Sequence, residues 1–197
     1  YCLNGLAEDD AAALQAADIR PVLNSPEQVR LARSLGPLPC AIQLDSGMNR
    51  LGLEASEVAA LFATPCPLDA RLVMSHLACA DDAAHPMNET QRAAFETLAA
   101  HPRLAPLPRS LAATGGVLMG EAYHYALTRP GIGLYGGLPF AEAQPVVTLA
   151  VPVLQIRDVA PGETVGYGNA WTVARPSRVA TIAAGYADGL IRAMGGQ

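Results

Sequence analysis

Short apolar segments alternate with amphipathic segments along the first 140 residues of the chain. The apolar segments have the length and the β-branched content of buried strands. They are residues 19–24, 40–44, 71–76, 109–113 and 129–135, with residues 1–4 as a further candidate. The segments between them carry the spacing of amphipathic helices. This alternation predicts parallel strands joined by helical crossovers, as in an open doubly wound sheet or a (β/α)8 barrel.

Two polar clusters mark where helices are expected to begin. Ser25, Pro26 and Gln28 supply an N-cap, a proline at the first helical position and a capping-box glutamine. Asn88 and Gln91 occupy the same N-cap and capping-box positions before the next amphipathic run. Each cluster therefore predicts a helix between two strands.

The absence of a nucleotide motif favours the barrel over the open sheet. About six strands are expected, two fewer than a closed barrel contains. No Gly-x-Gly-x-x-Gly sequence follows the first complete strand, as a dinucleotide-binding fold would require. We therefore expect residues 1–140 to form a partial (β/α)8 TIM-type barrel that lacks its first units.

The helical spacing disappears from residue 143 onward. Residues 146–158 form a long β-rich run, Pro161 and Gly162 signal a turn, and two further β-rich runs follow at residues 164–173 and 178–184. About four strands are too few to complete a sandwich or barrel. Residues 141–197 are therefore expected to begin an antiparallel β domain, and both ends of the sequence look truncated.

Composition narrows the classes of function. The 197 residues are 51% hydrophobic and 16% charged with a net charge of −5, which excludes a disordered chain. Without a basic stretch we expect no nucleic-acid partner. The most apolar run, residues 146–154, is about half the length that crosses a bilayer, and no leader opens the chain, so we expect no membrane partner and a cytoplasmic location.

Two residue types limit the chemistry further. The four cysteines form no C-x-x-C pair and are expected to be reduced. All 13 Lys and Arg residues are arginines, so the chain has no side-chain amine for a Schiff base.

Arg50 lies in a glycine-containing turn, residues 45–52, that follows an expected strand. In parallel α/β sheets this edge holds the ligands, and the guanidinium fork of arginine suits a carboxylate or a phosphate. The alternative is a surface arginine paired with a nearby acid.

His76 ends the next expected strand, where a histidine can stack on a flat ring or move protons. Its neighbours Cys79, Asp81, Asp82 and His85 raise the alternative of a metal site. Their spacing matches no zinc pattern, so we expect no metal. A capping or buried histidine is the other alternative.

Two glycine-rich turns follow the expected strands at residues 109–113 and 129–135. Their free backbone N–H groups, together with the hydroxyl of Thr114, could cradle a phosphate, although such turns are often only turns. Glycines also flank Tyr167 and Tyr186 in the β region. The residues alone favour half-buried packing for such tyrosines, because a phenol acts as a base only beside positive charge.

Five motifs in one order resemble those of bacterial alanine racemases, pyridoxal-phosphate enzymes with a barrel and a β domain. The first, residues 44–52, reads LDSGMNRLG, and the third, residues 110–114, reads SLAAT. The others are residues 75–78, 129–136, and 165–168 leading to 185–189. The resemblance covers essentially the whole sequence, which corresponds to the middle of a family chain about twice as long.

The resemblance implies a site for pyridoxal 5'-phosphate. Arg129 would face the pyridine nitrogen and disfavour its protonation, which weakens the electron sink and suits a racemase. His76 would pack against the ring and link Arg129 to the catalytic tyrosine. Thr114 and the backbone of Gly131 and Ile132 would hold the phosphate.

The resemblance also implies interconversion of L-alanine and D-alanine, for peptidoglycan, by two bases on opposite faces of the substrate. Tyr167 would be the second base, contributed across the interface of a homodimer. Arg50 would contact the substrate carboxylate and the phenolic oxygen of the cofactor. The substrate entrance would be lined by Asp81, Tyr186, Asp188 and Arg192.

Three positions depart from the family pattern. The Schiff-base lysine, also the first base, would lie upstream of Tyr1, so these residues alone should be inactive. Gln43 stands where some members carry a carbamylated lysine that steadies the arginine corresponding to Arg50. Ala113 and Thr114 stand where many members have Asn-Ser. A broad-specificity racemase and a non-catalytic cofactor-binding module remain alternatives.

Overall fold

The computed structural model describes residues 1–63 and 68–191. The chain divides into two compact units, Tyr1–Val146 and Val147–Gln197, and each is described by itself. In the described residues no helix has the length and apolar character needed to cross a membrane. Cys2, Cys40 and Cys79 form no disulfide, and Cys66 lies outside the described residues.

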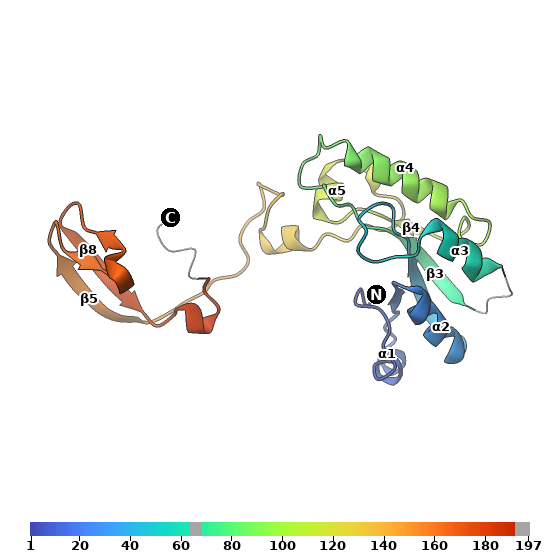
Figure 1. The fold of residues 1–197 in the computed structure, drawn as a ribbon, viewed down its shortest axis with the longest axis horizontal. Helices are drawn as coiled ribbons and strands as arrows, with labels where there is room; N and C mark the ends of the chain where they lie inside the picture. Colours follow the sequence, from blue (N-terminus) through green and yellow to red (C-terminus); the bar gives the residue numbers. More distant parts are fainter. Residues whose placement is uncertain (64–67, 192–197) are drawn as a thin grey trace. The chain divides into compact units, whose positions relative to one another are not determined.

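The first unit contains a four-stranded parallel sheet in the order β1-β2-β3-β4 (Figure 1). The strands are β1 (Val22–Leu23), β2 (Pro39–Gln43), β3 (Asp69–Met74) and β4 (Arg109–Ser110). The helices are α1 (Ala11–Ala16), α2 (Pro26–Ser34), α3 (Ala55–Phe62), α4 (Met87–Ala99) and α5 (Thr114–Leu118). A helix connects each pair of consecutive strands among β1, β2 and β3 and again before β4, which confirms the predicted α/β alternation.

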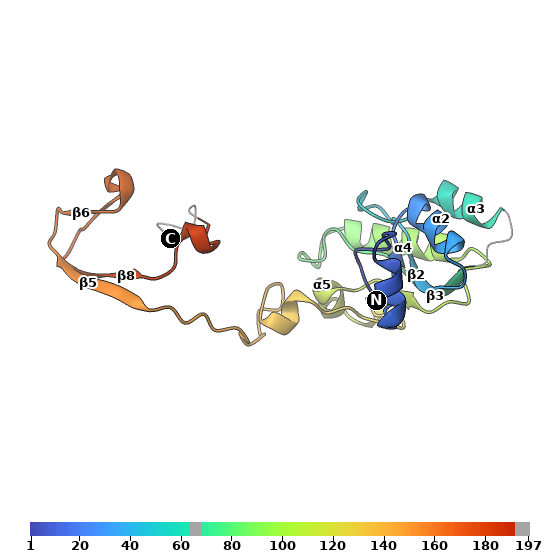
Figure 2. The same ribbon diagram turned by 90° about the horizontal axis from the view of Figure 1, so that it is seen from below.

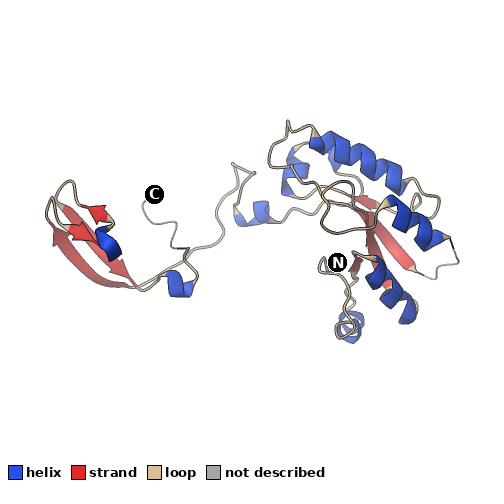
Figure 3. Cartoon of the chain, viewed as in Figure 1, coloured by secondary structure: helices blue, strands red, loops and turns tan. Residues whose placement is uncertain are grey.

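The two faces of this sheet bury different side chains, because successive residues of a strand point to opposite sides. Helices α2, α3 and α4 cover one face (Figure 3), where Val29, Val58 and Phe95 pack into the main core with strand residues such as Ile42 and Val73. A second cluster on the other face consists of Val22, Ala41, Leu72 and Met74. Packing on both faces holds the strands in place, and so positions the strand ends where the candidate residues lie.

The predicted strand over residues 129–135 is wrong. Arg129 forms only an isolated parallel bridge with Ala113, and residues Ile132–Tyr135 form a 3-10 helix. Pro130 has no backbone N–H to donate to a neighbouring strand, and Gly136 is left-handed (φ 84°), which ends the turn. The segment is consequently a loop beside the ends of the strands.

The predicted helix starts are partly correct. Ser25 caps α2, with its Oγ accepting from the backbone N–H of Gln28 at 3.3 Å, but the Gln28 amide oxygen accepts from Asn24 rather than completing a capping box. Helix α4 begins at Met87, one residue before the predicted cap. The ring Nδ1 of His85 accepts from the N–H of Met87 at 3.1 Å and so serves that end of the helix.

The second unit is built from antiparallel pairs, as predicted (Figure 2). Strand β5 (Val153–Val159) pairs with β8 (Ser177–Ile182), and β6 (Thr164–Val165) pairs with β7 (Trp171–Thr172). The predicted strand over residues 164–173 is interrupted by a 3-10 turn, Tyr167–Asn169. Gly166, Gly168 and Asn169 all have positive φ there, which a continuous strand does not allow.

Candidate active site

A cavity of about 410 Å³ lies at the carboxyl ends of the parallel strands, in the first unit. Open parallel sheets and barrels bind their ligands at this edge. Six residues singled out in the sequence line it together: His76, Asp81, Thr114, Arg129, Gly131 and Ile132. These residues come from three segments, 76–81, 114 and 129–132, which are thus brought to one site.

Arg129 supplies a partly buried positive charge to this cavity. Its Nη1 donates to Ser110 Oγ, and its Nη2 donates to the carbonyl oxygens of Ser75 at 2.7 Å and Leu111 at 3.2 Å. Burial lowers the pKa of Arg129 to about 10, which leaves it protonated at neutral pH. Within the described part of the chain, Arg129 forms no ion pair and its Nε donates to no group.

His76 lies beside this guanidinium, with its Nδ1 3.3 Å from Nη2 of Arg129. An arginine N–H can only donate, so Nδ1 accepts and the ring proton sits on Nε2. Burial is the largest cause that lowers the pKa of His76, followed by the charges of Arg129 and Arg50. The imidazole is therefore neutral at pH 7 and presents Nε2–H as a donor.

We expect a proton NMR titration of the full-length apoprotein to place the pKa of His76 below 6.5. A lowered pKa means that the unfolded state binds more protons, so the contribution of His76 to stability should rise with pH between the folded value and 6.5 and stay constant above and below that window. Arg129→Gln should raise the pKa of His76 only part of the way back, because burial remains. A titration midpoint at or above 6.5 would contradict this description.

Thr114 is arranged as a hydroxyl donor. Its Oγ1 accepts from the N–H groups of Gly131 and Gly133, each at 3.1 Å, and so uses both acceptor positions. The hydroxyl proton remains to be donated to a group in the cavity. A Cβ at position 133 would lie 2.7 Å from Thr114 Cγ2, so this arrangement requires glycine there.

The turn that carries Arg50 is shaped by Asp45. One carboxylate oxygen of Asp45 accepts from the N–H groups of Gly47, Met48 and Asn49 at 2.8, 2.9 and 3.2 Å. Arg50 itself is exposed and lines an adjacent cavity rather than the one with Arg129.

The side chain of Gln43 supports this turn by binding the turn's main chain. The buried Gln43 amide donates to the carbonyl oxygen of Leu51 at 3.2 Å. Gln43 thus contacts the main chain of the residue next to Arg50.

The β-domain candidates belong to the second unit. Tyr167 is 81% exposed and Tyr186 is 69% exposed, so neither is the half-buried packing residue that the local sequence favours. Asp188 ends a 3-10 turn, Tyr186–Asp188, where its carboxylate accepts from the N–H of Gly185 at 2.9 Å. Arg192 lies outside the described residues.

Two of the side chains considered for a metal, those of Asp82 and His85, hydrogen-bond to the loop backbone. Asp82 accepts from the N–H of Ala84 at 3.0 Å, and His85 accepts from Met87. Across residues 1–63 and 68–191, no three His, Cys, Asp or Glu side chains are placed to hold a metal ion.

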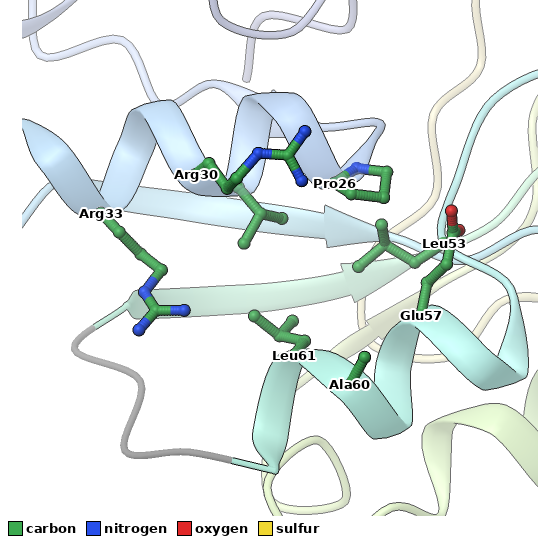
Figure 4. A pocket seen from close by; sticks show the side chains of 8 residues that line it. Pro26, Arg30, Arg33, Leu53, Glu57, Ala60 and Leu61 are labelled. Atoms are coloured by element: carbon green, nitrogen blue, oxygen red, sulfur yellow. The ribbon is translucent and has the colours of Figure 1, made fainter.

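A separate cavity of about 230 Å³ lies between helices α2 and α3 (Figure 4). Arg30, Arg33 and Glu57 contribute to its lining, and Arg30 is paired with Glu27 at 2.6 Å. None of the candidate site residues lines it, so it is not the candidate active site.

Sequence reasoning missed the polar residues behind the cavity. Ser75 and Ser110 are almost fully buried at the strand ends. The carbonyl oxygen of Ser75 and the Oγ of Ser110 accept hydrogen bonds from Arg129. Gln91 is fully buried on α4 and contacts the backbone of His76. Small hydroxyl residues at the carboxyl ends of buried strands were the available signal for the first two.

Known proteins of similar sequence and structure identify the family. Alanine racemase of Cereibacter sphaeroides is 54% identical over 192 residues, which are 97% of this chain and 54% of that protein. The alanine racemase of Bartonella henselae, with covalently bound pyridoxal phosphate, has a TM-score of 0.80 and 34% identity over 97% of this chain and 56% of its own. The biosynthetic alanine racemase of Pseudomonas aeruginosa has a TM-score of 0.79 and 36% identity, over 96% and 56%.

The chain thus spans about half the length of the curated relatives it matches. The structural likeness confirms the predicted fold class, a partial barrel followed by a β domain. Residues 1–139 match the family model described as alanine racemase, N-terminal domain, and residues 146–197 match that of the C-terminal domain. The chain belongs to the alanine racemase family.

Proposed function

We propose that the protein containing these residues is an alanine racemase that uses pyridoxal 5'-phosphate to interconvert L-alanine and D-alanine. One observation carries the proposal: Arg129, neutral His76 and the free hydroxyl proton of Thr114 meet in one cavity. The family membership and the cofactor in the Bartonella relative support it. D-alanine for peptidoglycan is the product that we expect, in the cytoplasm.

The donor set fits this cofactor. Thr114 offers a hydroxyl proton for a phosphate oxygen, with Gly131 and Ile132 at the same edge of the cavity. A Cβ added at Gly131 would meet no atom within 4 Å, so this edge is open. Arg129 would face the pyridine nitrogen, and its Nε–H donates to no group within the described residues. When bound, pyridoxal phosphate supplies the electron sink that makes the Cα proton of an amino acid acidic.

Arg129 and His76 would keep that site positively charged but free of mobile protons. The guanidinium stays protonated and donates only, so it disfavours a second proton on the nitrogen it faces. His76 accepts from Arg129 at Nδ1 and donates from Nε2, which makes it a link between Arg129 and a phenolate. The two residues would thereby limit side reactions and hold the base in position.

Tyr167 is proposed as the base on one face of alanine, where its phenolic oxygen would take the Cα proton from one enantiomer and supply a proton to Cα when the opposite base has taken one from the other enantiomer. Its exposure of 81% within the second unit is consistent with a side chain that acts on another barrel, in a homodimer. Arg50 would bind the substrate carboxylate. Asp81, Tyr186, Asp188 and Arg192 are proposed to line the entrance.

The base on the opposite face must come from outside these 197 residues, because they contain no lysine. We therefore expect racemisation from the full-length protein and none from this stretch alone. The test of function must use the longer chain.

Thr114→Val tests the proposed cofactor site. Valine keeps the shape but removes the hydroxyl proton and the acceptor for two N–H groups. We expect the dissociation constant of the full-length apoprotein for pyridoxal phosphate to rise about tenfold to a hundredfold. Thr114→Ser keeps the hydroxyl and should stay within about threefold of the original. Equal affinities in all three proteins, measured by fluorescence titration, would remove Thr114 from the phosphate site.

A further inference from the structure

Gln91 is a fully buried polar residue that connects two loops of the candidate site. It lies on α4, and its side-chain oxygen accepts from the N–H of Ala78 at 2.7 Å. Its amide nitrogen donates to the carbonyl oxygen of His76 at 3.0 Å and to Ser46 Oγ at 3.4 Å. Gln91 thus holds the main chain on both sides of Leu77 and also contacts the turn that carries Arg50.

The backbone partners of Gln91 determine which end of its side-chain amide donates and which accepts. A backbone N–H can only donate and a carbonyl oxygen can only accept, which sets the orientation of the Gln91 amide. Ser75 Oγ donates to the carbonyl oxygen of Leu44 at 2.7 Å, so it accepts from Ser46 Oγ at 2.7 Å. Ser46 in turn accepts from Gln91. The donors therefore run in one direction from α4 through Ser46 and Ser75 to the end of β2.

This network joins the turn that carries Arg50, proposed to bind the substrate, to the segment that carries His76, proposed to contact the cofactor. Ser46 belongs to the Asp45 turn, four residues before Arg50. Ser75 also presents its carbonyl oxygen to Arg129, and His76 follows it directly. A displacement of Gln91 would therefore reach the proposed carboxylate-binding residue and the proposed ring-contacting residue together.

We propose that Gln91 is a positioning residue that sets the spacing between the Arg50 turn and the His76 segment, and so couples substrate binding to cofactor binding. The inference rests on the proposed function of those two residues. An apolar side chain of similar size would fill the space beneath the loops without the cost of burying an amide. The amide is the part of Gln91 that sets the loop geometry.

Gln91→Glu tests this role because glutamate has the same shape. The introduced carboxyl group still accepts from Ala78 but carries at most one proton in place of two amide N–H groups, so it cannot donate to both His76 and Ser46. The control is Asn88→Asp on the same helix, since Asn88 is 1% exposed and its amide donates to the carbonyl oxygen of Asp82 at 2.8 Å. Both variants lose one kind of buried donor, but only one of them lies beside His76.

Hydrogen exchange in the full-length apoprotein reads the loop order without the cofactor. We expect Gln91→Glu to speed exchange at residues 45–52 and 75–81 at least about tenfold. Asn88→Asp should speed it only around residues 80–86. The Gln91→Glu apoprotein should also bind pyridoxal phosphate at least about tenfold more weakly, while Asn88→Asp stays within about threefold.

Ser46→Ala separates the two halves of the coupling. It breaks the link to the Arg50 turn and leaves the contacts of Gln91 with His76 and Ala78. We expect a KM for alanine raised about threefold or more, with the cofactor dissociation constant within about twofold. In the Gln91→Glu protein the same Ser46→Ala change should add little.

Unchanged exchange in Gln91→Glu, or equal effects of Asn88→Asp on the His76 segment, would overturn the positioning role. So would additive effects of the Ser46 and Gln91 changes on KM. A protein that shows the expected exchange and cofactor changes but racemises no amino acid would instead contradict the proposed function. The two failures are therefore distinguishable.

Discussion

Replacing Tyr167 by phenylalanine should lower racemisation by the full-length protein about a hundredfold to ten-thousandfold, because a positioned acid–base group contributes that much. L-alanine and D-alanine have equal free energies, so the net rates in the two directions remain linked even when one base is lost. The asymmetry should appear in exchange. In D2O, one enantiomer should still incorporate deuterium at Cα without inversion, through the remaining base, and the other should not.

Tyr135→Phe is the matched control for this change. Tyr135 is also an exposed tyrosine, at 65%, and it does not line the cavity with Arg129. We expect its variant to racemise within about twofold of the original protein. Equal losses of deuterium incorporation from both enantiomers in Tyr167→Phe would count against a base on one face only.

Replacing Arg129 by glutamine should weaken both the fold and the cofactor site. The change removes a charged donor from Ser110, Ser75 and Leu111, and buried acceptors without a partner cost about 1–3 kcal/mol each. We expect the free energy of unfolding of the full-length apoprotein to fall by about 3 kcal/mol or more, measured by urea denaturation. Pyridoxal phosphate should bind at least about a hundredfold more weakly.

Arg103→Gln removes an exposed arginine from the same unit and serves as the control. Its effect on unfolding should stay within about 0.5 kcal/mol, as is usual for surface positions. If Arg129→Gln unfolds like the original protein, the hydrogen bonds of Arg129 do not support the strand ends. If it binds the cofactor normally, Arg129 is not part of the cofactor site.

The strand pattern was predictable because its signal is local. The apolar runs at residues 40–44 and 71–76 predict buried strands, and β2 and β3 overlap them but begin one and two residues earlier. The expected strand at residues 129–135 failed because Pro130 and the glycines around it outweigh the apolar residues. Likewise, the β-rich run at residues 164–173 hides a turn that positive φ values at Gly166 and Gly168 create.

The candidate site was predictable to the extent that parallel strand ends share one edge. His76 and Thr114 follow β3 and β4, so their convergence is expected from the fold class, and Arg129 joins them through its isolated bridge with Ala113. The role of Gln91 could not be predicted from the sequence. A glutamine three residues after Asn88 fits a capping box, and the same spacing is compatible with a side chain that binds the preceding loop. Only the start of α4 at Met87, together with the folded β3–α4 loop, separates the two interpretations.

The most direct test of the proposed function is the conversion of alanine by the full-length protein that contains these residues. The apoprotein should be prepared, given pyridoxal phosphate, and supplied with L-alanine in D2O. We expect cofactor-dependent formation of D-alanine that carries deuterium at Cα, proceeding to an equal mixture of the two enantiomers. A folded protein that binds pyridoxal phosphate but leaves L-alanine without inversion would contradict the proposed racemase.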